Sequence, residues 1–303
     1  MPDEVAMIEI PRILCPVDFS DVSRCALDHA IAIARSYDSR ISALHVLSEE
    51  LIIPPRLLFT EFRTLNGIER RDAAETHLRG WLLPATRDGV PIDPIVEHGD
   101  AARVILQHAV RGEFDLVVMG THGRGGFERL VLGSVAEKVL RKAECPVITV
   151  PPRTATGANA PYERLLCPVD FSPSSNEALD FAVSIAEESN ADLTILNVVD
   201  FPSDDELQFA RGEAIEFRRL IEAVARRQLD ALVADEDRMR CKPRTRMERG
   251  KPYQQILSVA ADERTDLIVM GVRGRNPVDV AIFGSTTNHV VRGASCPVLT
   301  VRT

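Results

Sequence analysis

The feature that most constrains this chain is a segment of seven residues that occurs twice. Leu14–Ser20 (LCPVDFS) recurs unchanged as Leu166–Ser172, an interval that is half of the 303-residue length. Since a segment of about 150 residues can bury its own core, the repeat predicts two copies of one domain. We expect a first domain over 1–152, a linker over 153–162 with the composition of a loop, and a second domain over 163–303.

Charge and hydropathy exclude several classes of protein. The net charge is −9 and both halves are acidic, which disfavours a general nucleic-acid binder, whose contact surface is basic. No apolar run approaches the roughly 20 residues of a membrane helix. The first residues also lack the basic-then-apolar pattern of an export signal. We therefore expect a cytoplasmic protein with no membrane or nucleic-acid partner.

The six cysteines offer neither a disulfide framework nor a metal site. No pair has CxxC spacing, and no cysteine–histidine cluster has the spacing of a zinc site. Cys15, Cys145, Cys167 and Cys296 each precede Pro-Val, and we expect them in strands as small buried hydrophobes. The sequence thus predicts reduced core thiols, as is usual in the cytosol.

Strands and helices are predicted in the same order in both halves. Short unalternating apolar runs are typical of parallel strands buried on both faces. Ser20 and Ser172 each precede a helix, the second with Pro173 at its first position. This alternation predicts an α/β fold with a parallel sheet and right-handed crossovers. The predicted strands include 13–17, 41–47, 116–120 and 147–150, and in the second half 193–199, 267–271 and 298–301.

The segment after the second strand differs most between the halves. In the first half, the sequence predicts a loop over 48–60 and then a helix to about Leu83. In the second half, it predicts one long amphipathic helix over Asp204–Ala234. The basic stretch Arg238–Arg246 then leads into an edge strand, which basic side chains commonly guard; the alternative is an anion-binding patch. The expected apolar face of the long helix is formed by Ala210, Ala214, Phe217, Ile221 and Val224.

A glycine pattern, G-x2-G-x9-G-S, stands at the end of a strand and before the last helix in both halves. Glycine after a buried strand allows a close backbone approach at the sheet edge where open α/β sheets bind ligands. The last glycine and the serine open a helix, whose free N–H groups favour phosphate, and the serine hydroxyl is available to a phosphate oxygen or as a cap. The alternative is that the glycines only shape a turn. The pattern is formed by Gly120, Gly123, Gly133 and Ser134, and again by Gly271, Gly274, Gly284 and Ser285.

With these motifs the chain resembles a tandem universal stress protein, and each half resembles the ATP-binding kind of that family. The resemblance implies, for each half, an open five-stranded parallel sheet of order 3-2-1-4-5 flanked by helices. It implies ATP binding, with Mg or Mn, by the glycine pattern and by an aspartate beside the adenosine. The residues it assigns are Asp18 and Asp170 for adenosine, Val46 and Val198 for adenine, Pro16 and Pro168 at the strand ends, and Val135 and Thr286 as phosphate N–H donors.

Further candidates adjoin these positions. The predicted site includes two pairs of equivalent residues at the ends of strands, one residue of each pair in each half. Four side chains of the glycine loops could also touch phosphate oxygens. For the aspartates, a role limited to helix electrostatics is the alternative to ligand binding. The strand-end pairs are Val17 with Val169 and Met119 with Met270, and the loop residues are His122, Arg124, Arg273 and Arg275.

We expect an ATP-binding regulatory protein of stress responses rather than an enzyme, since no nucleophile elbow and no HExxH motif occurs. Two alternatives stay open. One is a slow ATPase or a protein that phosphorylates itself on Ser134, Ser285 or Thr286. The other is an interaction scaffold that needs no nucleotide. The resemblance further implies a pseudo-dimer of the halves through 145–150 and 296–301, a possible homodimer, and a protein partner that the sequence does not identify.

Overall fold

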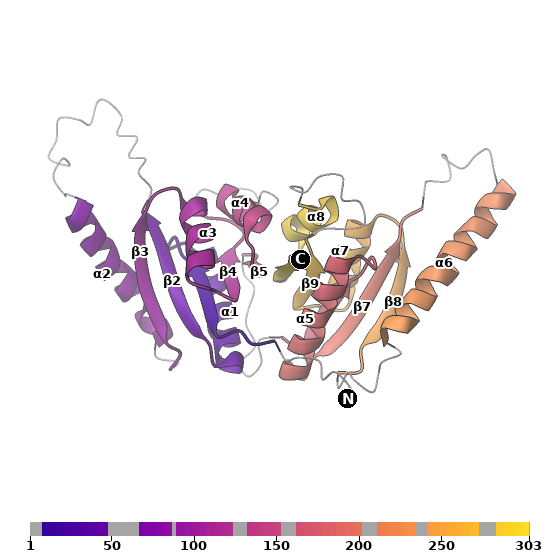
Figure 1. Ribbon diagram of the computed structural model, residues 1–303, viewed down its shortest axis with the longest axis horizontal. Helices are drawn as coiled ribbons and strands as arrows, with labels where there is room; N and C mark the ends of the chain where they lie inside the picture. The colour runs from indigo at the N-terminus through magenta and orange to yellow at the C-terminus, as the bar shows by residue number, and fades with distance from the viewer. Residues whose placement is uncertain are drawn as a thin grey trace, which may run out of the picture. The chain divides into compact units, whose positions relative to one another are not determined.

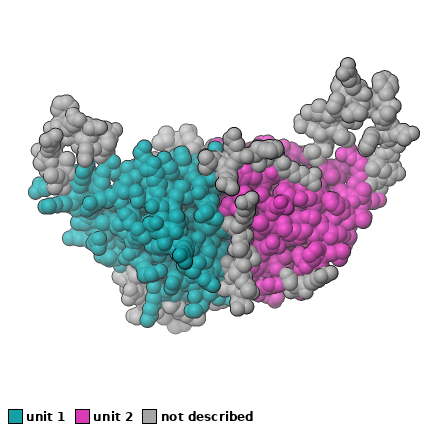
Figure 2. Space-filling model, turned by 180° about the vertical axis from the view of Figure 1, so that it is seen from behind, with its two compact units in different colours: residues 1–8, 157–303 teal, residues 9–156 magenta. Residues whose placement is uncertain are grey.

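A computed structural model describes residues 8–47, 67–86, 89–123, 132–152, 162–201, 211–233, 241–272 and 283–302. The chain divides into two compact units, residues 9–156 and residues 157–303 with 1–8, which are coloured separately in Figure 2. We call them the N-terminal half and the C-terminal half. In the described ranges, no helix is both long and apolar enough to cross a membrane.

The N-terminal half is a five-stranded parallel sheet with the strand order β3-β2-β1-β4-β5, as expected. The chain runs from β1 through β2 to β3 in one direction along the sheet, and then to β4 and β5 in the other direction. Because the crossovers are right-handed, α1 and α2 lie on one face of the sheet and α3 and α4 on the other. The elements are β1 (Arg12–Pro16), α1 (Asp21–Tyr37), β2 (Arg40–Leu47), α2 (Gly67–Thr86), β3 (Ile92–His98), α3 (Ala101–Arg111), β4 (Leu116–Gly120), α4 (Ser134–Lys142) and β5 (Val147–Val150) (Figure 1).

The C-terminal half repeats this order as β8-β7-β6-β9-β10, again with all strands parallel. Among the described residues of this half, β8 pairs with β7 alone, so the basic stretch leads into an edge strand, as predicted. The elements are β6 (Arg164–Pro168), α5 (Pro173–Ser189), β7 (Asp192–Val199), α6 (Arg211–Val233), β8 (Arg244–Arg249), α7 (Pro252–Asp262), β9 (Leu267–Gly271), α8 (Ser285–Gly293) and β10 (Val298–Val301).

The local sequence explains why α1 and α5 begin and end where they do. The Ser20 hydroxyl accepts a hydrogen bond from the Ser23 N–H, and Ser172 does the same for its own helix. Asp38 and Asn190 end these helices in the left-handed conformation, with φ of 51° and 50°, which aspartate and asparagine tolerate better than most residues. Between the caps, each helix buries one apolar face, with Ala26, Ala30 and Ile33 in α1 and Ala178, Ala182 and Ile185 in α5.

The predicted apolar face of α6 is wrong at two of its positions. Phe217 and Val224 are 59% and 46% exposed, whereas Ala225 and Leu229 are buried. A helix of 23 residues is about 34 Å long, whereas a six-residue strand such as β8 spans about 20 Å. In Figure 1, α6 extends past the end of β8, so part of its apolar surface has no sheet to pack on. Residues 204–210 and 234, also assigned to this helix, lie outside the described ranges.

Other expectations need smaller corrections. Cys145 and Cys296 precede β5 and β10 rather than lying in them, and Cys145 is only partly buried. Cys15 and Cys167 lie in strands and are fully buried, as expected. The helix predicted to end near Leu83 continues to Thr86. The expected loop over 48–60 and the basic residues 238–240 lie outside the described part of the chain.

Candidate functional site

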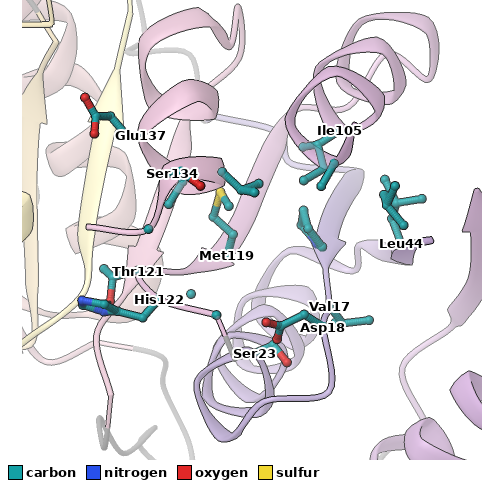
Figure 3. Close-up of a pocket in the computed structure, with 18 of the residues that line it drawn as sticks. Val17, Asp18, Ser23, Leu44, Ile105, Met119, Thr121, His122, Ser134 and Glu137 are labelled. Carbon is teal, nitrogen blue, oxygen red and sulfur yellow. The ribbon is translucent and has the colours of Figure 1, made fainter. Parts of the chain in front are cut away.

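A cavity of about 730 Å³ opens at the carboxyl ends of β1 and β4 in the N-terminal half. The strand order reverses between these two strands, and such a switch point is where open α/β sheets bind ligands. In Figure 3, Asp18 and Ser23 lie on one side, Ile105 on the other, and Met119 between them. The residues that line it are Pro16, Val17, Asp18, Ser23, Leu44, His45, Val46, Ala101, Ile105, Met119, Gly120, Thr121, His122, Gly123, Leu132, Gly133, Ser134, Val135, Ala136 and Glu137.

The cavity brings together the residues that the sequence predicted for this half. Every one of them lines it except Arg124, which lies outside the described residues. Sequence reasoning missed the apolar wall formed by Leu44, Ile105 and Leu132. These side chains lie in β2, in α3 and in the segment before α4. Their apolar spacing in the sequence is the same for a residue that faces the core and for one that faces a cavity, so the sequence carries no signal that distinguishes the two.

Asp18 is held in place by the start of α1. Its Oδ1 accepts hydrogen bonds from the Ser20 N–H at 3.1 Å and from the Ser20 hydroxyl at 2.6 Å. Ser20 Oγ in turn accepts from the Ser23 N–H at 3.1 Å. The intervening Phe19 has a φ of +65°, an unusual conformation for a bulky residue. The carboxylate therefore supports the helix and lines the cavity at the same time, so both predicted roles have a structural basis.

The glycines of the pattern differ in what they make possible. A Cβ atom on Gly123 would lie 2.7 Å from Asp18 Oδ2, so only glycine lets this loop come so close to the carboxylate. A Cβ atom on Gly120 would lie 2.8 Å from Val22 Cγ1 on α1. Gly120 thus serves the packing of α1 on β4, and Gly123 shapes the cavity.

Gly133 and Ser134 form the start of α4. The Gly133 N–H donates to the Thr121 carbonyl at 2.8 Å, which joins the two ends of the glycine loop. Gly133 is the N-cap residue, and among the described residues no side chain caps the helix. Ser134 is the first helical residue and therefore does not cap it. The first N–H groups of α4 thus keep their capacity to bind an anion, and the helix dipole favours one there.

His122 lines the cavity, and the phosphate contact expected of it stays a prediction. Its ring lies beside Thr121, on the side away from Asp18 (Figure 3). The Thr121 hydroxyl and His122 Nδ1 are 2.9 Å apart. Nε2 is buried and has no hydrogen-bond partner among the described residues.

The wall next to Asp18 is tied to α2 through aromatic side chains. The Phe19 ring lies 4.4 Å from the His45 ring, 4.3 Å from the His77 ring and 5.8 Å from Trp81. The Arg24 guanidinium stacks over the Trp81 ring at 3.4 Å and donates to the Trp81 carbonyl. Because Phe19 follows Asp18 directly, α2 contacts the residue next to the cavity's carboxylate.

The C-terminal half repeats part of this geometry. Asp170 Oδ1 accepts from the Ser172 N–H at 3.1 Å, and Asn197 donates to the Val169 carbonyl at 2.8 Å, where His45 contacts the Val17 carbonyl in the other half. Predicted residues stand at the ends of β6 and β9, in β7 and at the start of α8. They are Pro168, Val169, Asp170, Val198, Met270, Gly271, Gly284, Ser285 and Thr286.

Two features distinguish this second set. A Cβ atom on Gly271 would lie 2.6 Å from the Ser174 carbonyl oxygen, and the Thr287 hydroxyl donates to the Gly271 carbonyl at 3.0 Å. In the first half, Ala136 stands at the position of Thr287 and has no hydroxyl group. Arg273, Gly274 and Arg275 lie outside the described residues, so the predicted phosphate loop of this half stays a prediction.

Comparisons with known proteins agree with this architecture. The model of the universal stress protein family matches residues 9–151 and again 161–302. A universal stress protein of Mycolicibacterium smegmatis is 26% identical over 96% of both chains. A universal stress protein of Methanocaldococcus jannaschii is 36% identical over 144 residues, covering 46% of this chain and 81% of its own length.

Solved structures show the same fold over nearly the whole chain. The crystal structure of a universal stress protein from Archaeoglobus fulgidus has a TM-score of 0.69 at 22% identity and covers 97% of both chains. A protein of unknown function from Pseudomonas aeruginosa has a TM-score of 0.70 at 19% identity, over 98% of this chain and 94% of its own. The chain belongs to the universal stress protein family and contains two domains of that family in tandem.

Proposed function

We propose that this chain is a regulatory protein of stress responses that binds ATP in the cavity of its N-terminal half. The observation that carries the proposal is that Asp18, the Gly123 loop and the start of α4 surround one cavity of about 730 Å³. That volume lies in the usual range for small-ligand and cofactor sites. Its place at the strand switch point also favours ligand binding.

The chemistry of the cavity suits the three parts of a nucleotide. Leu44, Ile105 and Met119 supply an apolar wall for the base. Asp18 presents a carboxylate, which accepts hydrogen bonds from sugar hydroxyls. The uncapped N–H groups at the start of α4 suit the phosphates. A magnesium or manganese ion would accompany the nucleotide, and it would neutralise part of the phosphate charge.

Binding is favoured over turnover by the acids that line the cavity. Asp18 is engaged by Ser20, and Glu137 forms an ion pair with Arg141 at 3.0 Å. Because both carboxylates already have these partners, neither is arranged as a general base that activates water. We therefore propose a nucleotide-dependent switch in the cytoplasm. Phosphate release above background, in protein supplied with magnesium or manganese, would favour the ATPase alternative.

The tandem arrangement supports two further parts of the proposal. The C-terminal half would bind a second nucleotide through Asp170 and the start of α8, and the halves would pair as a pseudo-dimer through their last strands. Small-angle scattering of the full chain tests the pairing, because two separate bodies on a flexible linker would contradict it.

Thermal unfolding with and without Mg-ATP tests the nucleotide proposal. A ligand present at 100 times its dissociation constant adds about 2.7 kcal/mol to the free energy of unfolding. Gly123→Ala should reduce this stabilisation, because the added methyl group would meet Asp18 Oδ2 at 2.7 Å. Gly80→Ala is the matched control, since nothing lies within 4 Å of its added Cβ atom. An equal response to ATP in both variants would contradict the assigned site.

A further inference from the structure

A second cavity, of about 570 Å³, lies on α3 and α4 of the N-terminal half. The two helices lie side by side (Figure 1) and also line the first cavity, but they do so with other residues. We call this second cavity the α3–α4 groove. Its lining residues are Asp100, Ala102, Arg103, Leu106, Gln107, Val110, Arg111, Lys138, Lys142 and Glu144.

The groove is basic in an acidic protein. Four cationic side chains line it against two carboxylates, whereas the whole chain has a net charge of −9. Asp100 partly compensates two of the cations: Lys138 Nζ lies 3.6 Å from its Oδ2, and the pKa of the Asp100 carboxyl is lowered by a hydrogen bond from the Arg103 N–H and, to a smaller extent, by the charges of Lys138 and Arg103. Apolar side chains accompany the cations, and Val110 is 54% exposed. The groove thus combines an excess of positive charge with exposed apolar surface.

Helix stability explains only some of these cations. Arg111 and Lys142 stand in the last turns of α3 and α4, where cations are favoured by the helix dipole. Arg103 stands in the first turn of α3, where the dipole disfavours a cation. Lys138 is in the middle of α4, where the dipole gives no reason for one. Asp100 attracts both of these cations, but one carboxylate offsets only one of the two charges, so an excess of positive charge remains.

The C-terminal half provides an internal comparison. At the positions of Arg103, Arg111, Lys138 and Lys142, it has in turn Gln254, Asp262, His289 and Gly293. Since the two halves have the same fold, the fold does not require the four cations.

The same face is also filled differently in the C-terminal half. The His289 ring stacks on Tyr253, with centroids 4.5 Å apart. A Cβ atom on Gly293 would lie 2.7 Å from Leu257 Cδ1, so α7 and α8 pack closely there. The four cations are therefore particular to the N-terminal half.

We propose that the α3–α4 groove binds an acidic peptide segment of a partner protein. Carboxylates of the segment would pair with Arg103, Arg111, Lys138 and Lys142, and an apolar side chain would cover Leu106 and Val110. The 11-residue helix α3 is about 16 Å long, which matches about five residues of extended peptide. Nucleic acid is disfavoured as the occupant, because the described residues that line the groove include no aromatic ring on which a base could stack. The proposal does not depend on nucleotide binding in the first cavity.

The test is fluorescence anisotropy with the full-length protein and a short fluorescein-labelled peptide rich in glutamate and containing leucine. The variant is Arg103→Gln/Lys138→Gln, which leaves the Asp100 cap of α3 in place. The control is Arg226→Gln/Arg227→Gln, which removes two exposed cations from α6 and changes the net charge by the same amount. Circular dichroism verifies that both variants are folded.

We expect the groove variant to weaken peptide binding about tenfold, as two rim ion pairs are lost, with the control close to the original protein. Equal weakening in both variants would overturn the proposal, because the attraction would then be general. Absence of peptide binding at low salt would overturn it as well. So would stronger competition by single-stranded RNA or polyphosphate than by unlabelled peptide.

Discussion

Gly120 and Gly271 occupy the same position in the two halves, and alanine at each should have a different cost. An added Cβ atom at Gly120 would meet the side chain of Val22 at 2.8 Å, and that side chain has some freedom to move. At Gly271 it would meet the carbonyl oxygen and carbon of Ser174 at 2.6 and 2.7 Å. These atoms belong to the backbone of α5, so relief requires the helix itself to shift.

The expected magnitudes follow from these contacts. Overpacking a well-packed interior costs about 1–3 kcal/mol, and we place Gly271→Ala near the upper end and Gly120→Ala near the lower end. Replacing glycine by alanine also restricts the unfolded chain, which offsets about 0.4–1 kcal/mol. We therefore expect Gly271→Ala to lower the free energy of unfolding by about 2 kcal/mol, and Gly120→Ala by less than about 1 kcal/mol.

Urea unfolding followed by far-UV circular dichroism measures both free energies. Trp81 is the single tryptophan and belongs to α2, so its fluorescence identifies the transition of the N-terminal half. Equal losses of stability in the two variants, or a larger loss for Gly120→Ala, would refute the reasoning from backbone contact.

Three further predictions concern named side chains. Asp18→Ala should weaken Mg-ATP binding and lower stability by about 2 kcal/mol, since the carboxylate accepts two hydrogen bonds from Ser20; calorimetry and urea unfolding would show both effects, and unchanged binding would contradict the role. Burial lowers the pKa of His29 to about 4, so the unfolded chain takes up a proton before the folded one, and stability is lost as the pH falls from about 6.5 to 4. His29→Gln should reduce this loss by roughly 2–3 kcal/mol in a pH titration of the free energy of unfolding. An unchanged slope would count against the assignment. Burial raises the pKa of the Cys15 thiol to about 12, so a thiol reagent at pH 8 should modify Cys15 only after unfolding, as mass spectrometry of the labelled peptides would verify.

The fold was largely predictable because both halves have the same residues at the ends of their helices and strands. Ser20 and Ser172 predicted helix starts, and the structure confirms both as N-caps. The apolar runs predicted the central strands because parallel strands are buried on both faces. The long helix α6 was predicted less well, since a helical apolar period does not reveal how much sheet is available to cover it. Phe217 and Val224 are exposed for that reason.

The candidate site was predictable where it rests on strand ends and glycines. Asp18, Gly123 and Ser134 lie around one cavity because parallel strands end at the same edge of the sheet. The roles of individual residues were less predictable. Gly120 lies against Val22 of α1, and the His122 ring points away from Asp18. Side-chain direction and helix approach depend on tertiary contacts, which a motif does not encode.

Calorimetric titration of the nucleotide-stripped protein with Mg-ATP tests the central claim most directly. We expect saturable binding with at least one site per chain, lost from the N-terminal half in Asp18→Ala/Gly123→Val. The exposed substitution Arg226→Gln is the control and should leave the titration unchanged. Absence of saturable binding in folded protein, with magnesium and manganese each tried, would contradict the account. Binding that persists undiminished in the double variant would also contradict it, because the nucleotide would then occupy another place.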